Sequence, residues 1–227
     1  MVKPVDLTVP QFFQGRMRYE AKSMRHGPWH WSYTFKIYKK TFDFTLAVIA
    51  MPAIMAIAVV LLIANPFLNP GPLMFVQERL GRHRVPFRVY KFRTMAVASE
   101  MVRTADQGVE HTRITRLGRL MRKTRLDEMP NFINVLRGEM SVIGPRPDAI
   151  EHAEHYLEAI PHYSYRYLVR PGITGLAQIE SGYAEGMDAT AVKAHYDQLY
   201  VETSCGRLDV YIAWRTLRVM LTGFGAK

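Results

Sequence analysis

The sequence predicts an α/β fold that is mostly helical: a single globular domain with a proline-broken re-entrant membrane helix and interfacial amphipathic helices. Three observations support this prediction. The chain has 227 residues, enough for one domain with its own core. Its one long apolar segment, residues 44–64, contains a proline. Short strand-like runs then alternate with helical patterns, which indicates a mixed fold.

Residues 1–38 are predicted to be a basic and aromatic leader at the membrane interface. Trp29, Trp31, Tyr33 and Phe35 occupy every second position ahead of a lysine-rich run. Aromatic and lysine side chains suit the headgroup zone of a membrane. Four alternating residues are equally consistent with an edge strand or a packed loop, so these alternatives stay open.

The next segment, residues 39–66, is predicted to form a helix, a break and a second helix in the membrane. Over residues 44–64 only Thr45 is polar, and a straight helix of this length would measure roughly 31 Å. Pro52 removes a backbone hydrogen bond and favours a re-entrant hairpin. Basic residues flank both sides, which places both ends in the cytoplasm. A kinked spanning helix and a buried soluble helix are the alternatives.

Residues 67–227 are predicted to form the globular domain on the cytoplasmic side. Two β-rich runs, 73–77 and 86–92, are separated by a basic turn and indicate a hairpin. Arginines recurring between Arg113 and Arg125 predict a helix with a basic face. The apolar and basic residues of 191–221 predict amphipathic helices at the interface.

Adjacent carboxylates, Asp127 and Glu128, precede a predicted short helix over residues 131–137 that starts after Pro130. Acidic residues are favoured at helix N-termini, so both carboxylates have a structural explanation as caps. The chemical explanation is that the helix dipole keeps a carboxylate ionised, so that it can attack phosphorus without a base. These residues alone leave both explanations open.

Four basic residues are candidate phosphate ligands. Arg146 lies between two prolines after a predicted strand, residues 141–144, and a guanidinium fixed in this way suits bidentate phosphate binding. Lys91 and Arg93 end the hairpin, and Arg170 begins a Pro-Gly turn that has a plain structural explanation as well. The net charge of +10 indicates an anionic partner without choosing between nucleic acid, membrane and phosphorylated substrate.

These motifs resemble the bacterial polyprenyl-phosphate hexose-1-phosphate transferases, also called monotopic phosphoglycosyl transferases. The resemblance covers residues from about 39 to 221. It is carried by KKTFDF with the proline-broken segment, FVQERLG, YKFRTM, TRLGRLMRKTRLDEMPNFINVLRGEMSVIGPRP and VRPGITGLAQ. The chain resembles the minimal form of the family, since larger members carry several spanning helices ahead of this region.

The resemblance implies an enzyme that transfers a sugar 1-phosphate from a nucleotide diphosphate sugar, expected to be a UDP-hexose, to undecaprenyl phosphate. The nucleoside monophosphate would be released, and surface or exopolysaccharide assembly would begin. Residues 67–227 would be the catalytic domain, with Asp127 as the nucleophile of an aspartyl-phosphosugar and Glu128 as its acidic partner. Both would lie at a required Mg²⁺ ion, and Arg146 would contact phosphate.

The expected partners are a nucleotide sugar, polyprenyl phosphate and membrane lipid rather than nucleic acid, at the cytoplasmic face of the bacterial inner membrane. A homodimer stays open. Two other functions stay open as alternatives: a glycosyl transferase that releases nucleoside diphosphate, and a non-catalytic membrane-surface scaffold. The chain departs from the family pattern at Met51, at Arg125 and in IESGYAEG, so the sugar, the nucleotide base and the glycan pathway are not assigned.

Overall fold

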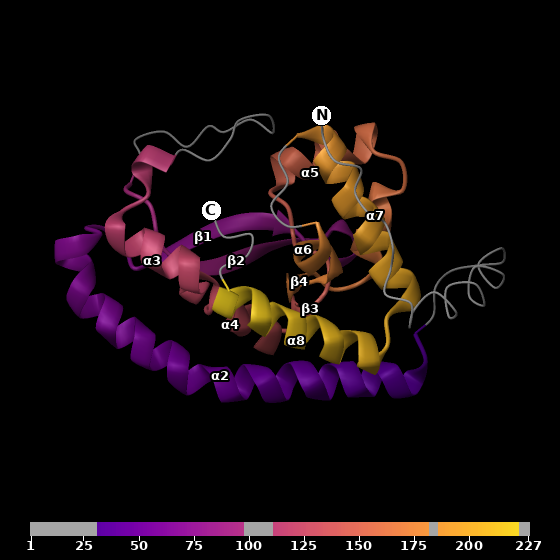
Figure 1. Cartoon of the computed structure of the whole chain (residues 1–227), viewed down its shortest axis with the longest axis horizontal. Helices are drawn as coiled ribbons and strands as arrows, with labels where there is room; N and C mark the ends of the chain where they lie inside the picture. The colour runs from indigo at the N-terminus through magenta and orange to yellow at the C-terminus, as the bar shows by residue number, and fades with distance from the viewer. Residues whose placement is uncertain (1–30, 98–110, 182–185, 223–227) are drawn as a thin grey trace.

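The computed structural model describes residues 31–97, 111–181 and 186–222, and its longest element is helix α2, Tyr33–Leu68. Ser32 caps this helix, because its side chain accepts a hydrogen bond from the backbone N–H of Phe35 at 3.2 Å. Figure 1 shows α2 along one side of the molecule, with a bend near its middle. Residues 1–30 of the predicted leader lie outside the described residues, and its last residues, from Tyr33 onward, are helical rather than a strand.

The predicted break at Pro52 requires a correction, because α2 continues through both Pro52 and Pro66. A proline removes one hydrogen bond and presses on the preceding turn, and a long helix can accommodate this by bending instead of ending. The two helices predicted within residues 39–66 are therefore one helix. This helix is long and apolar enough to cross a membrane by length and composition, and its re-entrant path stays a prediction.

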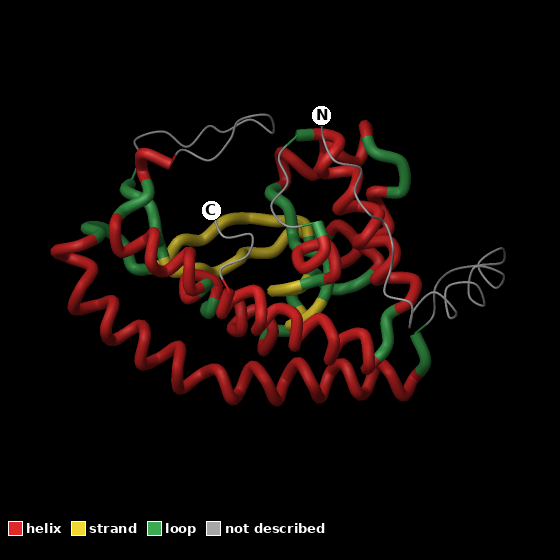
Figure 2. The backbone as a smooth tube through the Cα atoms, in the orientation of Figure 1, coloured by secondary structure: helices red, strands yellow, loops and turns green. Residues whose placement is uncertain are grey.

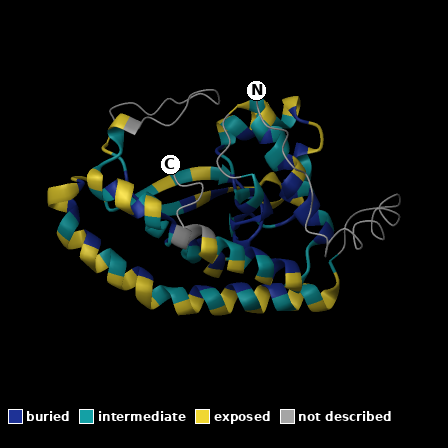
Figure 3. Cartoon of the chain, in the orientation of Figure 1, coloured by how far each residue is buried: buried dark blue, intermediate teal, exposed yellow. Residues whose placement is uncertain are grey.

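The two faces of α2 differ. Its buried residues recur at intervals of four or seven and therefore share one face; they are Lys39, Asp43, Ala47, Ile54, Leu61 and Asn65. The opposite face exposes large apolar side chains, including Phe44, Ile49, Met55, Val60, Ile63 and Phe67. Figure 3 shows exposed residues recurring along the outer side of this helix. An exposed apolar face of this length is typical of a helix in contact with lipid.

The predicted hairpin is confirmed. Strands β1 (Met74–Leu80) and β2 (Pro86–Phe92) pair antiparallel, and the 3₁₀ turn η1 (Arg82–Arg84) connects them. The first strand extends beyond the predicted residues 73–77 and includes Arg79. Phe87 and Val89 alternate with exposed residues along β2 and point into the core.

The basic helix and the short helix after Pro130 are also confirmed. The basic helix is α3 (Arg116–Thr124), and Thr115 caps it by accepting a hydrogen bond from the Gly118 N–H at 3.0 Å. The 3₁₀ turn η3 (Leu126–Glu128) follows, and α4 (Asn131–Leu136) comes next. Another short 3₁₀ turn, η2 (His111–Arg113), precedes α3.

The rest of the chain builds a second small sheet and its helical cover. Strand β3 (Ser141–Ile143) confirms the predicted strand and pairs parallel with β4 (Gly172–Thr174). The remaining elements are α5 (Ile150–Ala159), η4 (Tyr163–Leu168), α6 (Leu176–Glu180), α7 (Met187–Thr203) and α8 (Gly206–Thr222). Figure 2 shows both sheets inside a largely helical molecule, which confirms a mostly helical domain. The placement of α8 at a membrane interface stays a prediction.

Helix α2 contributes to two hydrophobic clusters of the domain. Ala47 belongs to the main core with Ile143 and Ile212, residues of β3 and α8. Further along the helix, Ile54 and Leu61 pack with Phe92 and Met121. Both halves of α2 therefore pack on the same globular body.

Candidate active site

The candidate carboxylates lie on the 3₁₀ turn between two helices, where the chain changes direction sharply. Arg125 has φ 59°, a left-handed conformation that ends α3 and leads directly into η3. Asp127 and Glu128 follow, and both are buried, with 9% and 7% of their surface exposed. Neither caps α4, because Pro130 begins that helix without a side-chain cap. The capping explanation of the two carboxylates is therefore wrong.

Glu128 is held by two of the predicted phosphate ligands. The Arg146 guanidinium donates from Nη1 to Glu128 Oε2 at 3.0 Å and from Nη2 to Oε1. Lys91 Nζ donates to the same Oε1 at 3.2 Å. Two parallel bonds of this kind fix the guanidinium in orientation as well as position. The structure therefore brings three of the predicted site residues, Glu128, Arg146 and Lys91, together, and their roles stay predictions.

This contact determines the charges of the three groups. Burial alone would raise the pKa of Glu128, but the charges of Arg146 and then Lys91 outweigh it and hold the pKa well below its usual range. Glu128 in turn raises the pKa of Arg146. Burial lowers the pKa of Lys91 to about 8, although Glu128 opposes this shift. Glu128 is thus firmly anionic, whereas the pKa of Lys91 lies only about one unit above neutral pH.

Asp127 is in the opposite situation. Its Oδ1 atom is buried and has no hydrogen-bond partner. Burial, and next the neighbouring charge of Glu128, raise the pKa of Asp127 to about 6. Desolvation thus raises the pKa of Asp127 instead of a helix dipole lowering it, although a value of about 6 still leaves the carboxylate mostly ionised at neutral pH. Adjacent carboxylates with opposite pKa shifts are typical of a site where each has a separate role.

The turn that carries Arg146 is fixed through its carbonyl groups. Prolines lack an N–H, so the segment Gly144-Pro145-Arg146-Pro147 is held mainly by hydrogen bonds that its carbonyl oxygens accept. Three successive carbonyls receive donors: Pro145 O from Gly172 N at 2.8 Å, Arg146 O from Arg166 Nη2 at 2.6 Å, and Pro147 O from Arg79 Nη1. The orientation of Arg146 is thus determined by segments before and after it in sequence.

Arg79 and Arg166 are site residues that the sequence interpretation missed. The alternation of exposed and partly buried residues along β1 could have identified Arg79, because Arg79 lies two residues after Gln77 and points to the same, partly buried face. Arg166 has no such signal, since its buried ion pairs are with Asp148, and with Asp197 at 3.0 Å. Burial raises the pKa of Asp197 to about 7, although the charge of Arg166 opposes the shift.

The other two predicted phosphate ligands lie elsewhere. Arg93 donates from Nε to Pro72 O at 2.6 Å and from Nη1 to Met95 O at 2.8 Å, and further bonds join it to Asn69. These bonds hold the connection between α2 and the hairpin, and the phosphate role of Arg93 stays a prediction. Arg170 lies beside Gly138. Within the described residues, no hydrogen bond or ion pair joins either arginine to Asp127 or Glu128.

Ligands for Mg²⁺ are limited at this site. The described residues contain no group of three or more His, Cys, Asp or Glu that could hold a metal. Mg²⁺ in phosphoryl transfer needs only one or two carboxylates, since substrate phosphates and waters supply the rest. Asp127 Oδ1 and Asn131 Oδ1 are buried without partners and lie four residues apart. Asp127 and Asn131 fit as ligands, whereas Glu128 would first have to release Arg146 or Lys91.

Comparison with known proteins gives consistent results. The sequence model of the family described as "Bacterial sugar transferase" matches residues 34–223. A UDP-N-acetylgalactosamine-undecaprenyl-phosphate N-acetylgalactosaminephosphotransferase of Aeromonas hydrophila is 42% identical over 191 residues, covering 83% of this chain and 45% of the relative. A UDP-glucose:undecaprenyl-phosphate glucose-1-phosphate transferase of Klebsiella pneumoniae is 36% identical over 183 residues, covering 80% of this chain and 39% of the relative. The chain thus spans less than half the length of these two relatives.

Proposed function

Because the chain belongs to the bacterial sugar transferase family, we propose that it transfers a sugar 1-phosphate from a nucleotide diphosphate sugar to undecaprenyl phosphate. The donor is a UDP-hexose in this proposal, since the relatives named above act on UDP-linked sugars. The product is an undecaprenyl diphosphate sugar, the first intermediate of a surface or exopolysaccharide. The observation that carries the proposal is the buried, unpartnered oxygen of Asp127 beside the Glu128–Arg146–Lys91 cluster.

The reaction proceeds in two displacements at phosphorus. The Asp127 carboxylate attacks the phosphorus that carries the sugar, the bond from this phosphorus to the nucleoside monophosphate breaks, and an aspartyl-phosphosugar forms. An oxygen of undecaprenyl phosphate then attacks the same phosphorus, and the bond to Asp127 breaks. The carboxylate is regenerated, so no oxidant, reductant or further reactant is needed.

The neighbouring residues each have a role in these steps. A pKa of about 6 leaves Asp127 mostly ionised at neutral pH, and its carboxylate is already largely removed from water because the residue is buried. Arg146 and Lys91 face the charge that the phosphoryl oxygens develop. Glu128 keeps Arg146 in a fixed orientation before substrate binds. When bound at Asp127 and Asn131, Mg²⁺ would neutralise the diphosphate and the departing nucleoside monophosphate.

The acceptor is a membrane lipid, so the proposal includes a topology. Helix α2 enters the cytoplasmic face of the bacterial inner membrane and returns to it, so that both of its ends are cytoplasmic. Support comes from its packing: Ala47 contacts the main core, and Leu61 contacts the second cluster of the same domain. A helix held at both halves by one globular body favours a path with both ends on the side of that body. Its outer apolar face would then contact lipid.

The reaction is tested with the full chain in nanodiscs and a panel of UDP- and GDP-sugars. Without lipid acceptor, we expect about one equivalent of nucleoside monophosphate per enzyme and a phosphosugar adduct on the peptide that contains Asp127. Addition of undecaprenyl phosphate should discharge the adduct and start turnover. Asp127→Asn should lose both activities, whereas Asp188→Asn, at an exposed carboxylate on α7, should retain them.

Each alternative gives a different result. Nucleoside diphosphate as the product would identify a glycosyl transferase. Near-normal release of nucleoside monophosphate by Asp127→Asn would contradict the nucleophile. A phenotype in cells that survives replacement of both carboxylates would favour the scaffold. For topology, cysteines are placed at Ser32 and Val85 in a chain whose Cys205 is replaced, and labelling from opposite sides of the membrane would contradict the re-entrant path.

A further inference from the structure

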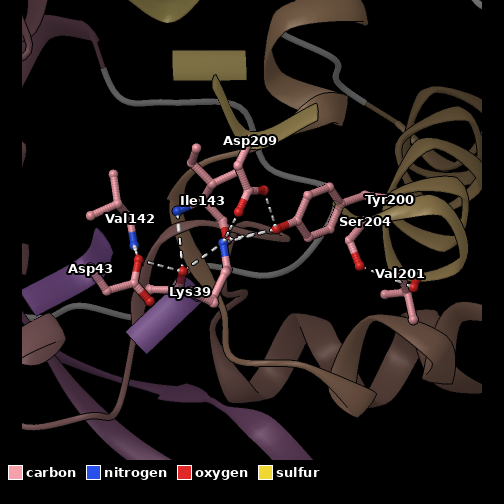
Figure 4. A network of polar contacts seen from close by, with 9 residues as sticks. Lys39, Asp43, Val142, Ile143, Tyr200, Val201, Ser204 and Asp209 are labelled. Atoms are coloured by element: carbon pink, nitrogen blue, oxygen red, sulfur yellow. Dashed lines mark hydrogen bonds and ion pairs between the residues drawn. The ribbon is translucent and has the colours of Figure 1, made fainter. Parts of the chain in front are cut away.

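A buried polar network connects the first half of α2 to the distant end of the chain. Lys39 Nζ donates to Ile143 O at 2.7 Å, to Tyr200 Oη at 3.0 Å and to Asp209 Oδ2 at 3.0 Å. Figure 4 shows these groups converging on the lysine from β3, α7 and α8. The Lys39 and Asp209 side chains are 7% and 0% exposed. Two charges buried this deeply need all of these partners, because desolvation is costly.

One helical turn further, Asp43 holds the same strand. Its Oδ1 accepts hydrogen bonds from Ser141 Oγ and from the Val142 N–H, both at 2.9 Å. Lys39 and Asp43 thus act on one face of α2, and Figure 4 shows both next to Val142 and Ile143. All three residues of β3 have a polar contact with this network, because Ser141 and Val142 bind Asp43 and Ile143 binds Lys39. Ser141 Oγ also contacts Ile143 O and N.

Strand β3 continues directly into the turn that carries Arg146. Gly144 follows Ile143 and is pinned by its N–H, which donates to Thr174 O at 2.8 Å. A Cβ at Gly144 would lie 2.6 Å from Arg170 O, so the backbone of Gly144 packs directly against the backbone of Arg170. Pro145 then fixes its own φ angle. A displacement of β3 would therefore pass to Arg146, three residues beyond Ile143.

We propose that Lys39 and Asp43 are positioning residues, through which the apolar helix α2 sets the place of the Arg146 guanidinium on Glu128. The proposal rests on the proposed function for its effect on catalysis. The structural part of the proposal does not depend on that function, because it concerns only the position of β3 and of the turn that carries Arg146. Helix α2 is then both the lipid-facing element and part of the scaffold of the catalytic site, and a change in the seating of α2 alters the site.

The variant that tests this is the double replacement Lys39→Met/Asp209→Asn. Lys39→Met alone would leave the Asp209 carboxylate buried without its cation and could unfold the chain. The double replacement removes both charges and still deletes the bond from Lys39 to Ile143 O. Glu78→Gln/Arg88→Met is the matched control, because it removes an ion pair between two exposed side chains of the hairpin.

The first measurement is amide hydrogen exchange in the full chain in nanodiscs. We expect faster exchange in peptides covering residues 141–148 of the double variant, by about tenfold or more, with unchanged exchange in residues 74–92. The control pair should match the wild-type chain in both regions. Unchanged exchange in residues 141–148 would overturn the proposal whether or not the chain is a transferase.

The second measurement is steady-state kinetics with the best sugar nucleotide. A misplaced Arg146 should raise the KM for the sugar nucleotide and lower kcat/KM by about 10- to 100-fold. A merely structural role would lower the active fraction, and so kcat, at constant KM. A normal KM in the double variant would overturn the proposal. Inactivity of the wild-type chain with every donor would contradict the proposed function instead, while the exchange result would still decide the positioning.

Discussion

Arg146 binds Glu128 through two parallel hydrogen bonds, one of them 3.0 Å long, so a partly exposed arginine is paired with a buried carboxylate before any substrate is present. The adjacent Asp127 has no such partner on its buried Oδ1. Glu128 therefore binds the two cations Arg146 and Lys91, whereas Asp127 is free to react. This division leads to opposite expectations for the two carboxylates when each is replaced.

Asp127→Asn should stabilise the protein at pH 7 while removing activity. The folded pKa of about 6 lies above the ordinary 3.8, so folding disfavours the ionised form of Asp127. The resulting loss of folding free energy is fully present above about pH 6. Removing the charge should raise the free energy of unfolding by about 1–2 kcal/mol, or Tm by about 2–8 °C. Thermal unfolding in detergent measures it. The gain should vanish below about pH 4, and a Tm decrease at pH 7 would contradict the buried, uncompensated charge.

Glu128→Gln should do the opposite and destabilise the protein. The pKa of Glu128 is lowered by folding, so its contribution to stability is present above the ordinary value of 4.5 and is lost as the pH falls through the folded value. Glutamine leaves Arg146 and Lys91, which are both partly exposed, without an anion. The cost should be smaller than the roughly 3–5 kcal/mol of breaking a fully buried pair, because solvent screens the Arg146 guanidinium. Thermal unfolding should show a lower Tm at pH 7, whereas Asp188→Asn should lower it much less, because only a helix-dipole interaction at an exposed site is lost. An unchanged Tm would indicate that water replaces the carboxylate at low cost.

How much of this site was predictable depends on the range of each interaction. The hairpin, α4 and β3 follow from local patterns of apolar residues and prolines, and the sequence predicts them correctly. The proximity of Arg146 to Asp127 and Glu128 follows from the family resemblance. The pKa of Asp127 was not predictable, because its direction comes from burial that only the folded chain supplies.

The longest-range contacts left no local signal. Lys39 reads in the sequence as one of several interfacial lysines, yet its partner Asp209 is 170 residues away. In the sequence, Arg93 is a basic residue at the end of a predicted strand. The carbonyl oxygens of Asn69 and Pro72, to which it donates hydrogen bonds, come from the turn after α2. The path of α2 shows a similar limit, because Pro52 predicts a disturbance of the helix but cannot distinguish a bend from an end.

The pH dependence of kcat/KM should be bell-shaped, with an acidic limb near 6 and an alkaline limb near 8. Activity should rise as Asp127 ionises and fall as Lys91 loses its proton. Lys91→Arg should move the alkaline limb upward by at least about one pH unit, since arginine does not titrate in this range. Lys91→Met should move the acidic limb upward, because Lys91 lowers the pKa of Asp127. Limbs that do not respond to either replacement would assign the titrations to other groups.

Arg93→Met should weaken folding without changing substrate affinity, in contrast to Arg146→Met. Arg93 holds three backbone carbonyls and the Asn69 side chain, so its loss leaves buried acceptors unpaired at about 1–3 kcal/mol each. Arg146→Met removes a cation that faces the reacting phosphate, so the KM for the sugar nucleotide should rise by about tenfold or more. Measuring Tm and KM for both variants separates the two roles. If Arg93→Met raised the KM at a nearly normal Tm, Arg93 would contact phosphate and its assignment to the connection after α2 would be wrong.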